Sequence, residues 1–153
     1  MSPFYENLNL QLQGLLDGED DWIATLANAS ALLWLNLERI NWAGFYLRRG
    51  DQLVLGPFQG KPACTRIDMG KGVCGTSAAE KTPQIVVDVH EFPGHIACDA
   101  ASNSEIVIPM IFNGEVVGVL DIDSPELNRF SEEDLIGLQP LINLVMSKFT
   151  GKH

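Results

Sequence analysis

The stretch SEIVIPMIFNGEVVGVLDIDSP, residues 104–125, decides the fold because it has the pattern of a complete β-hairpin. Two apolar runs rich in Val and Ile flank the dipeptide Asn113-Gly114. Asn and Gly tolerate the positive φ angles of a two-residue hairpin turn, so this pair is the strongest short turn signal in the chain. The stretch therefore predicts two paired antiparallel strands.

A second hairpin is predicted upstream. The runs INWAGFYLRR (residues 40–49) and GDQLVLGPF (50–58) alternate between apolar and polar residues. They are joined through Arg49-Gly50-Asp51, where Gly50 supplies the positive φ that the turn needs. A further short β run, KTPQIVVDV, covers residues 81–89.

Helices are predicted at both ends of the chain. Apolar residues recur at steps of three and four in residues 2–19, which stop at Asp17-Gly18, and again in residues 20–38, where Asp20 or Asp21 is the N-cap. Residues 131–149 open with Ser131 and Asp134 at capping-box spacing. This order predicts an α+β fold in one domain, residues 1–153: a central antiparallel sheet with the terminal helices packed on one face.

The middle of the chain, from Pro57 to His95, is the part that fits regular structure least well. We expect a long loop there, and loops of that length in a compact domain tend to be functional. Its glycines at positions 70, 72 and 75 leave two interpretations open. They form a tight turn before a short surface helix, or they open a helix whose N-terminus binds a carboxylate. The Walker spacing of a nucleotide-hydrolysis site is absent from the sequence.

Composition narrows the functional classes. The chain has 153 residues, 46% of them hydrophobic, and a formal net charge of −10. An acidic surface repels phosphate backbones and anionic lipid, which argues against nucleic-acid and membrane partners. The sequence has no apolar run of membrane-spanning length and no signal-peptide pattern at its start. We therefore expect a cytoplasmic protein.

Three cysteines, Cys64, Cys74 and Cys98, are the reactive groups that stand out. Structural disulfides are rare in the cytosol, so the odd count favours buried, reactive or metal-bound thiols. The spacing lacks any CxxC or HExxH motif, and structural zinc sites usually bring paired ligands close together in the sequence. We expect no metal and no cofactor.

Several residues are candidates for a site, each with a structural alternative. Asp121 and Asp123 lie two apart on a strand and so share a face, yet they also suit a polar strand end. Glu105 begins the preceding strand, where it could be solvated, and Cys98 could be a small buried apolar residue. Trp42 and Tyr46 also share a face, and on the sequence alone they are more simply explained as core aromatic residues. The residues alone do not decide between the functional and the structural explanation of these candidates.

The chain resembles the free methionine-(R)-sulfoxide reductase family, which is built on a GAF domain. The resemblance runs from about Asn41 to Phe130 and rests on the segments NWAGFYL, GPFQGKPACTRIDMGKGVCGTSA, QIVVDVHEFPGHIACDAASNSEIVIPM and GVLDIDSP. It implies that Cys98 is the nucleophile, that Cys64 is the main resolving cysteine, and that Cys74 has a secondary resolving role. It further implies that the substrate is bound by Glu105, Asp121, Asp123, Trp42 and Tyr46.

The chemistry agrees with these residue types. A sulfoxide sulfur is electrophilic only when its oxygen is protonated or strongly hydrogen-bonded, so a thiolate needs an acid facing it. Three carboxylates on one face would raise at least one pKa, and the others would hold the ammonium group of a free amino acid. Attack leaves a sulfenic acid on Cys98 that condenses to a disulfide, and thioredoxin, at about −270 mV, is the expected reductant. We expect the cysteine-bearing loop to fold over the site.

Two other classes stay open at this point. A ligand-sensing GAF module without catalysis would bind a small molecule with its cysteines dispensable. A structural or dimerisation domain would label slowly with thiol reagents and would not respond to oxidised methionine. The resemblance also leaves a homodimer open, because no apolar stripe in the sequence separates a dimer interface from the core.

Overall fold

The fold is a six-stranded antiparallel sheet with helices on both faces. The computed structural model describes residues 1–95 and 101–151. The strands lie in the order β3-β2-β1-β6-β5-β4, and every neighbouring pair is antiparallel. Their bounds are β1 Trp42–Arg49, β2 Gln52–Gly60, β3 Arg66–Asp68, β4 Gln84–Val86, β5 Ser104–Phe112 and β6 Glu115–Ser124. The helices are α1 Pro3–Leu16, α2 Trp22–Asn36, α3 Gly72–Glu80 and α4 Glu132–Met146, with a short 3-10 turn η1 at Val89–Glu91.

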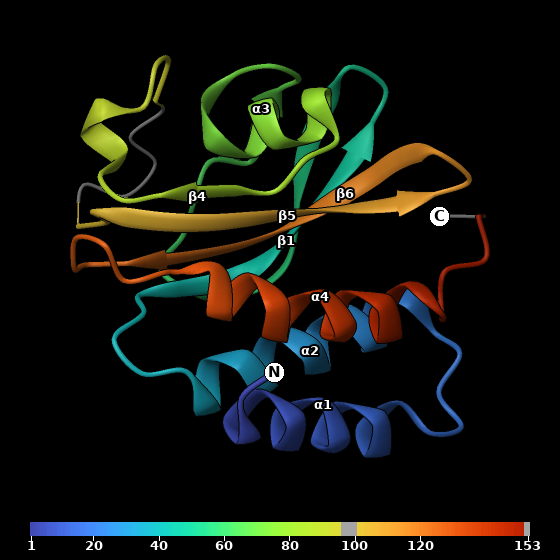
Figure 1. The fold of residues 1–153 in the computed structure, drawn as a ribbon. Coiled ribbons are helices and arrows are strands. Elements are labelled where there is room, and N and C mark those ends of the chain that lie inside the picture. Colours follow the sequence, from blue (N-terminus) through green and yellow to red (C-terminus); the bar gives the residue numbers. More distant parts are fainter. Residues whose placement is uncertain (96–100, 152–153) are drawn as a thin grey trace.

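The terminal helices α1, α2 and α4 lie together on one face of the sheet, while α3 lies on the other (Figure 1). This confirms the predicted α+β architecture. The predicted helix starts are also confirmed: Asp21 caps α2 by accepting a hydrogen bond from the Ala24 N–H, and Ser131 and Asp134 form a capping box at α4. The hairpin turn at Asn113-Gly114 has positive φ at both residues, as a type I′ turn requires.

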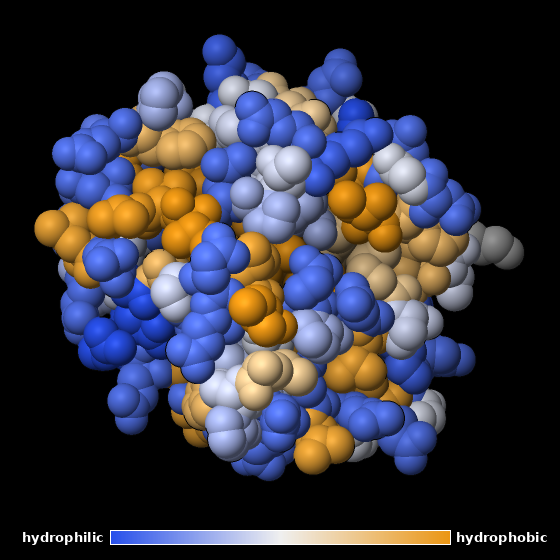
Figure 2. Space-filling model, viewed as in Figure 1, coloured by the Kyte–Doolittle hydropathy of each residue, from blue (hydrophilic) through white to orange (hydrophobic). Residues whose placement is uncertain are grey.

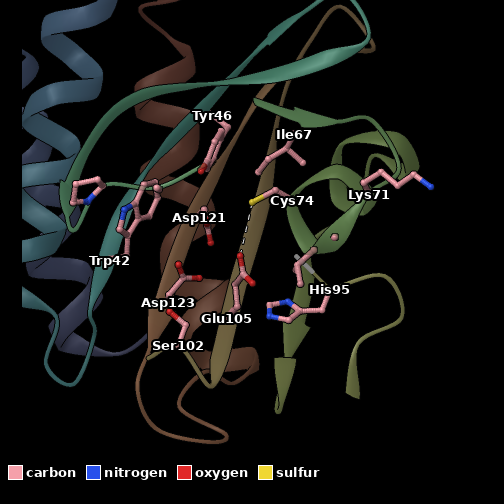
Figure 3. Close-up of a pocket in the computed structure, with 14 residues that line it drawn as sticks. Trp42, Tyr46, Ile67, Lys71, Cys74, His95, Ser102, Glu105, Asp121 and Asp123 are labelled. Carbon is pink, nitrogen blue, oxygen red and sulfur yellow. Dashed lines mark hydrogen bonds between the residues drawn. The ribbon is translucent and has the colours of Figure 1, made fainter. Parts of the chain in front are cut away.

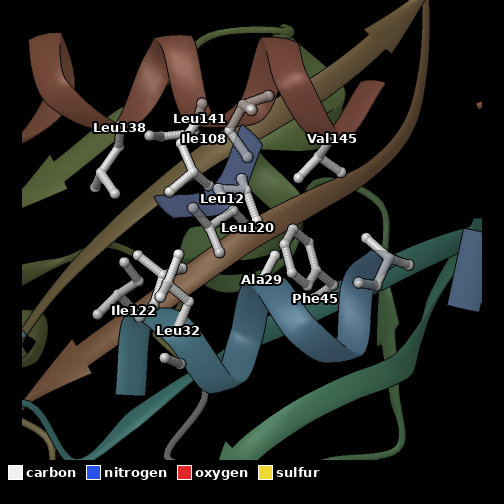
Figure 4. Packing of buried hydrophobic residues seen from close by; sticks show 14 of the residues in the cluster. Leu12, Ala29, Leu32, Phe45, Ile108, Leu120, Ile122, Leu138, Leu141 and Val145 are labelled. Atoms are coloured by element: carbon white, nitrogen blue, oxygen red, sulfur yellow. The ribbon is translucent and has the colours of Figure 1, made fainter. Parts of the chain in front are cut away.

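The main core lies between the sheet and the three terminal helices. Its side chains come from alternate positions of the strands, such as Ile106 and Ile108 on β5 and Leu120 and Ile122 on β6. They pack against Leu12, Ala29, Leu32, Leu138, Leu141 and Val145 of the helices (Figure 4). Because side chains alternate along a strand, the intervening residues of β5 and β6 point to the opposite face.

The stretch from Pro57 to His95 differs from its expectation as a long loop. It contains the end of β2, all of β3, α3 and β4, and the turn η1. The glycines at the start of α3 serve different ends: Gly70 and Gly72 have positive φ angles, as a tight turn requires, whereas a Cβ on Gly75 inside the helix would lie 2.5 Å from the Asp68 carbonyl oxygen. The helix α3 is also not a surface helix, since Val73, Cys74 and Ala78 are buried in a second cluster on this face.

Some apolar side chains of the helical layer are exposed. They include Leu10 on α1, Leu35 on α2 and Ile136 on α4. In Figure 2 apolar side chains alternate with hydrophilic ones over the visible face. Scattered exposed apolar residues are normal on a protein surface, so the homodimer stays a prediction. Within residues 1–95 and 101–151, no helix has the length and apolar character to cross a membrane.

Candidate active site

A pocket opens on the α3 face of the sheet, away from the main core. Its floor comes from β1, β5 and β6, one wall from α3, and another from the segment that joins β2 to β3 (Figure 3). Seven of the eight residues predicted for the site are described, and six of them line this pocket: Trp42, Tyr46, Cys74, Glu105, Asp121 and Asp123. Cys64 packs against the second buried cluster, which lies on this face of the sheet. Cys98 lies outside the described residues.

Three carboxyl groups meet on the floor of the pocket. Glu105 on β5 lies opposite Asp123 on β6, and Asp121 follows two residues away on the same face. Glu105 and Asp121 are only 8% and 5% exposed, so water screens their charges poorly. One oxygen of Asp121, Oδ1, is buried and accepts no hydrogen bond within the described part of the chain. A buried acceptor of this kind favours a ligand that donates hydrogen bonds.

Burial governs the protonation of these acids. It raises the pKa of Glu105 well above the ordinary range, and the negative charges of Asp121 and Asp123 raise it further. Burial also raises the pKa of Asp121, although hydrogen bonds with Glu105 and Asp123 act in the opposite direction. Of these two acids, Glu105 is therefore the one more strongly driven to hold a proton.

Cys74 contacts these acids from α3. Its Sγ donates to Oε2 of Glu105 at 3.8 Å. Burial, followed by the negative charges of Asp121 and Glu105, raises the pKa of the Cys74 thiol well above its ordinary value. Cys74 is a free thiol, whereas Cys64 is disulfide-bonded. A buried thiol with a raised pKa is a poor nucleophile, so the two cysteines differ in reactivity.

Aromatic rings form the wall beside the carboxyl groups. The ring of Trp42 stacks on Tyr46 with centroids 5.8 Å apart, and on Phe58 of β2 with centroids 5.1 Å apart. The same rings hold the β2–β3 segment through hydrogen bonds. Trp42 Nε1 donates to the Lys61 carbonyl at 3.1 Å, and the Tyr46 hydroxyl donates to the Cys64 carbonyl at 2.8 Å. The aromatic wall and the Cys64 backbone are thus one connected unit.

The pocket also contains residues that the sequence did not single out as site residues. Ser102, Ile67 and Lys71 line it, together with His95, whose pKa is lowered by burial and by the nearby His90. Phe58 extends the aromatic stack at its edge. Their places in the pocket depend on the packing of segments that are far apart in the sequence, which no local pattern specifies.

The cluster also has the donor atoms of a metal site. One ligand atom each from Cys74, Glu105 and Asp121 lie within 4.8 Å of one another, and all three residues are buried. A thiol with two carboxylates suits a divalent ion such as Zn²⁺, although carboxylates suit an organic ammonium group equally well. These residues come from α3, β5 and β6, so the sequence spacing that argued against a metal could not have revealed their proximity.

The fold and the site define a GAF-domain protein, and a family model described as GAF domain matches residues 25–147. Among curated proteins, the free methionine-R-sulfoxide reductase of Escherichia coli is 58% identical over 141 residues, covering 92% of this chain and 86% of that protein. The chain belongs to the free methionine-(R)-sulfoxide reductase family of oxidoreductases.

Solved structures agree with this assignment. The structure of fRMsr of Staphylococcus aureus in complex with substrate is 49% identical, with a TM-score of 0.90 and coverage of 94% of both chains. The free methionine-R-sulfoxide reductase of Neisseria meningitidis in complex with its substrate is 43% identical, with a TM-score of 0.92. It covers 95% of this chain and 87% of the Neisseria chain.

Proposed function

We propose that this protein reduces free L-methionine-(R)-sulfoxide to methionine, with Cys98 as the attacking thiol. The observation that supports this most directly is the carboxyl group cluster of Glu105, Asp121 and Asp123, the first two of them buried, beside an aromatic wall. Such a pocket offers an acid for the sulfoxide oxygen, anions for an ammonium group and an apolar surface for an S-methyl group. Family membership and the substrate complexes of the Staphylococcus and Neisseria proteins support the same substrate.

Asp121 and Asp123 are the proposed ammonium-binding groups. The buried Oδ1 of Asp121 has an acceptor position open to a charged N–H donor. A methionine inside a polypeptide has no charged α-amine, so it would leave the buried Asp121 without a cationic partner. A site built to hydrogen-bond one group rejects analogues that lack it, which explains a preference for the free amino acid.

Glu105 is the proposed proton donor. Its raised pKa favours the protonated form, and its side chain lies on the pocket floor in contact with Cys74. A proton given to the sulfoxide oxygen makes the sulfur electrophilic at the moment of attack. Trp42 and Tyr46 would hold the S-methyl group in place against their rings.

The proposed reaction then balances as follows. The Cys98 thiolate attacks the sulfoxide sulfur, the oxygen passes to the Cys98 sulfur as a sulfenic acid, and methionine leaves with the two electrons that Cys98 has lost. A second thiol attacks the sulfenic sulfur, forms a disulfide and releases the oxygen as water. A dithiol reductant finally restores both cysteines, becoming a disulfide itself.

Cys64 is the proposed main resolving cysteine, and Cys74 the secondary one. The disulfide-bonded state of Cys64 and the free, buried thiol of Cys74 support this order. The raised pKa of Cys74 leaves little thiolate to attack a sulfenic acid. Residues 61–65, which join β2 to β3 beside the pocket, would be the segment that brings Cys64 over the site.

Thioredoxin is the proposed reductant, and the cytoplasm is the proposed location of the reaction. Its potential of about −270 mV suits the reduction of a catalytic disulfide. The test is NADPH oxidation coupled through thioredoxin and its reductase, with free L-methionine-(R)-sulfoxide, the S epimer and a peptide with oxidised methionine compared in parallel. We expect turnover with the free R form alone.

Absence of turnover with all three substrates, even with dithiothreitol as the reductant, would contradict the proposed activity. Such a result from a folded, reduced sample would favour a sensing module that binds without catalysis. Turnover of the peptide at the rate of the free amino acid would instead contradict the ammonium-binding role of Asp121 and Asp123.

A further inference from the structure

Positive charge is concentrated around Cys64 in a protein that is otherwise acidic. The chain has 20 Asp and Glu residues against 10 Lys and Arg. Between residues 52 and 79 this balance reverses, because the charged residues there are Lys61, Arg66 and Lys71 with a single acid, Asp68. The carboxylate of Asp68 accepts a hydrogen bond from the Gln52 side chain.

Two of these cations flank the disulfide-bonded cysteine directly. Lys61 precedes Cys64 by three residues, Arg66 follows it by two, and both side chains are exposed. Among the ion pairs of residues 1–95 and 101–151, none involves Lys61 or Arg66. Consecutive Cα atoms are about 3.8 Å apart, so both cations begin within about a Debye length of Cys64.

Hydrogen bonds hold the backbone beneath these cations in the disulfide-bonded structure. The Lys61 carbonyl accepts from Trp42 Nε1, and the Cys64 carbonyl accepts from the Tyr46 hydroxyl. At the other end, Arg66 begins β3 and pairs with Val54 at the edge of the sheet. The two positive side chains are therefore presented from an ordered edge of the fold, on either side of the cysteine that must be reduced.

We propose that Lys61 and Arg66 form the docking surface for the reductant, a thioredoxin-class protein with acidic side chains around its dithiol. This inference rests on the proposed function. The attacking group in thiol–disulfide exchange is a thiolate, and the negative charge passes onto the leaving sulfur as the new S–S bond forms and the old one breaks. Flanking cations attract an acidic protein and orient it toward the disulfide.

The charge of the remaining surface makes this edge selective. An acidic reductant is repelled by a protein of net charge −10, except where the local charge is positive. Encounter is thereby directed to the segment that carries Cys64. A small neutral dithiol has no such requirement, which separates protein docking from chemistry in an experiment.

The test compares the double variant Lys61→Glu/Arg66→Glu with a matched control, Arg49→Glu/Lys148→Glu. Both variants change the net charge equally, but Arg49 ends β1 and Lys148 follows α4, away from Cys64 in the sequence. We expect the KM for thioredoxin to rise about tenfold in the Cys64-flanking variant only. Turnover with dithiothreitol should stay unchanged in both variants, and thioredoxin-dependent kcat/KM of the unaltered protein should fall as salt rises.

The result that overturns the docking surface is an unchanged KM for thioredoxin in Lys61→Glu/Arg66→Glu, or an equal rise in the control variant. Loss of the dithiothreitol-driven reaction in the flanking variant alone would also overturn it, by assigning these residues to the chemistry. Failure of the unaltered protein to turn over with dithiothreitol would contradict the proposed function itself, so the two failures are distinguishable.

Discussion

Glu105 on β5 lies directly opposite Asp123 on β6, so two carboxyl groups face each other across antiparallel strands on the floor of a pocket. Like charges directly opposite on a sheet face are destabilising. Burial raises the pKa of Glu105 most, and the negative charges of Asp121 and Asp123 raise it further. The sheet register and burial therefore act together to favour the protonated form of this acid.

Replacement of this acid should reduce the chemistry more than the fold. In Glu105→Gln the side chain keeps its size but loses the transferable proton, so we expect kcat to fall on the order of 10²- to 10⁴-fold. The melting temperature should not fall, because a neutral amide also ends the repulsion with Asp121 and Asp123. Steady-state kinetics and thermal unfolding measure the two effects. A kcat equal to that of the unaltered protein would show that another group protonates the sulfoxide.

The stability of the fold should depend on pH through the same residue. The pKa of Glu105 is raised on folding, so the folded protein binds more protons than the unfolded chain above about the ordinary value of 4.5. The free energy of unfolding therefore falls as pH rises from there through the folded pKa, by up to about 1.4 kcal/mol per pH unit. Asp121, also raised, adds to this slope, while His95, whose pKa is lowered, acts oppositely below its ordinary 6.5.

Urea unfolding of the unaltered protein and of Glu105→Gln, measured from pH 4 to pH 8, tests this. The difference between the two curves reports Glu105 together with its effect on the neighbouring Asp121, and it removes the contribution of His95 that both proteins share. We expect the variant to gain stability relative to the unaltered protein as pH rises. Parallel curves would mean that Glu105 has the same pKa in both states.

Substitution of each cysteine should affect a different step of the reaction. Cys98→Ser should bind substrate and produce no methionine, because the attacking sulfur is gone. Cys64→Ser should release one methionine per protein and then recycle poorly with thioredoxin, unless Cys74 replaces it. Cys74→Ser should keep nearly full thioredoxin-dependent turnover, since its thiol is buried and weakly ionised. Rapid-quench measurement of methionine beside steady-state NADPH oxidation distinguishes these outcomes, and normal multiple turnover by Cys98→Ser contradicts the assignment.

The Tyr46 hydroxyl should affect resolution more than attack. Tyr46→Phe retains the ring stacked on Trp42 but removes the 2.8 Å hydrogen bond to the Cys64 carbonyl, which is worth about 1 kcal/mol. We expect the first methionine to form at the normal rate and the disulfide to form several-fold more slowly. Trapping of the sulfenic acid with dimedone over time measures this delay. Unaltered disulfide formation would show that the hydrogen bond does not position Cys64.

The framework of the fold could be predicted from the sequence because local patterns specify it. The Asn113-Gly114 turn fixes one hairpin. Asp121 and Asp123 lie two positions apart on one strand, which places both side chains on the same face. The helix ends follow from Asp21 and from the Ser131 capping box. In each case a signal within a few residues agrees with the final packing.

The middle of the chain could not be predicted in the same way. The helix α3 consists of small and polar residues, GVCGTSAAE, which give little helical periodicity, and its stability comes from packing on the sheet. The contact between Cys74 and Glu105 joins residues 31 positions apart. Phe58 likewise joins the aromatic wall only through the pairing of β1 with β2. Such relationships depend on tertiary structure and leave no local pattern.

The sheet also divides the protein into two compartments with different tolerances for change. Burial of Glu105 and Asp121 in one pocket is costly, and the large apolar layer under α1, α2 and α4 on the opposite side compensates for it. Substitutions that improve packing in that layer could raise thermal resistance without touching a single reacting atom. We therefore expect that most substitutions that raise the thermal stability of the enzyme without loss of activity lie in the core between the sheet and α1, α2 and α4.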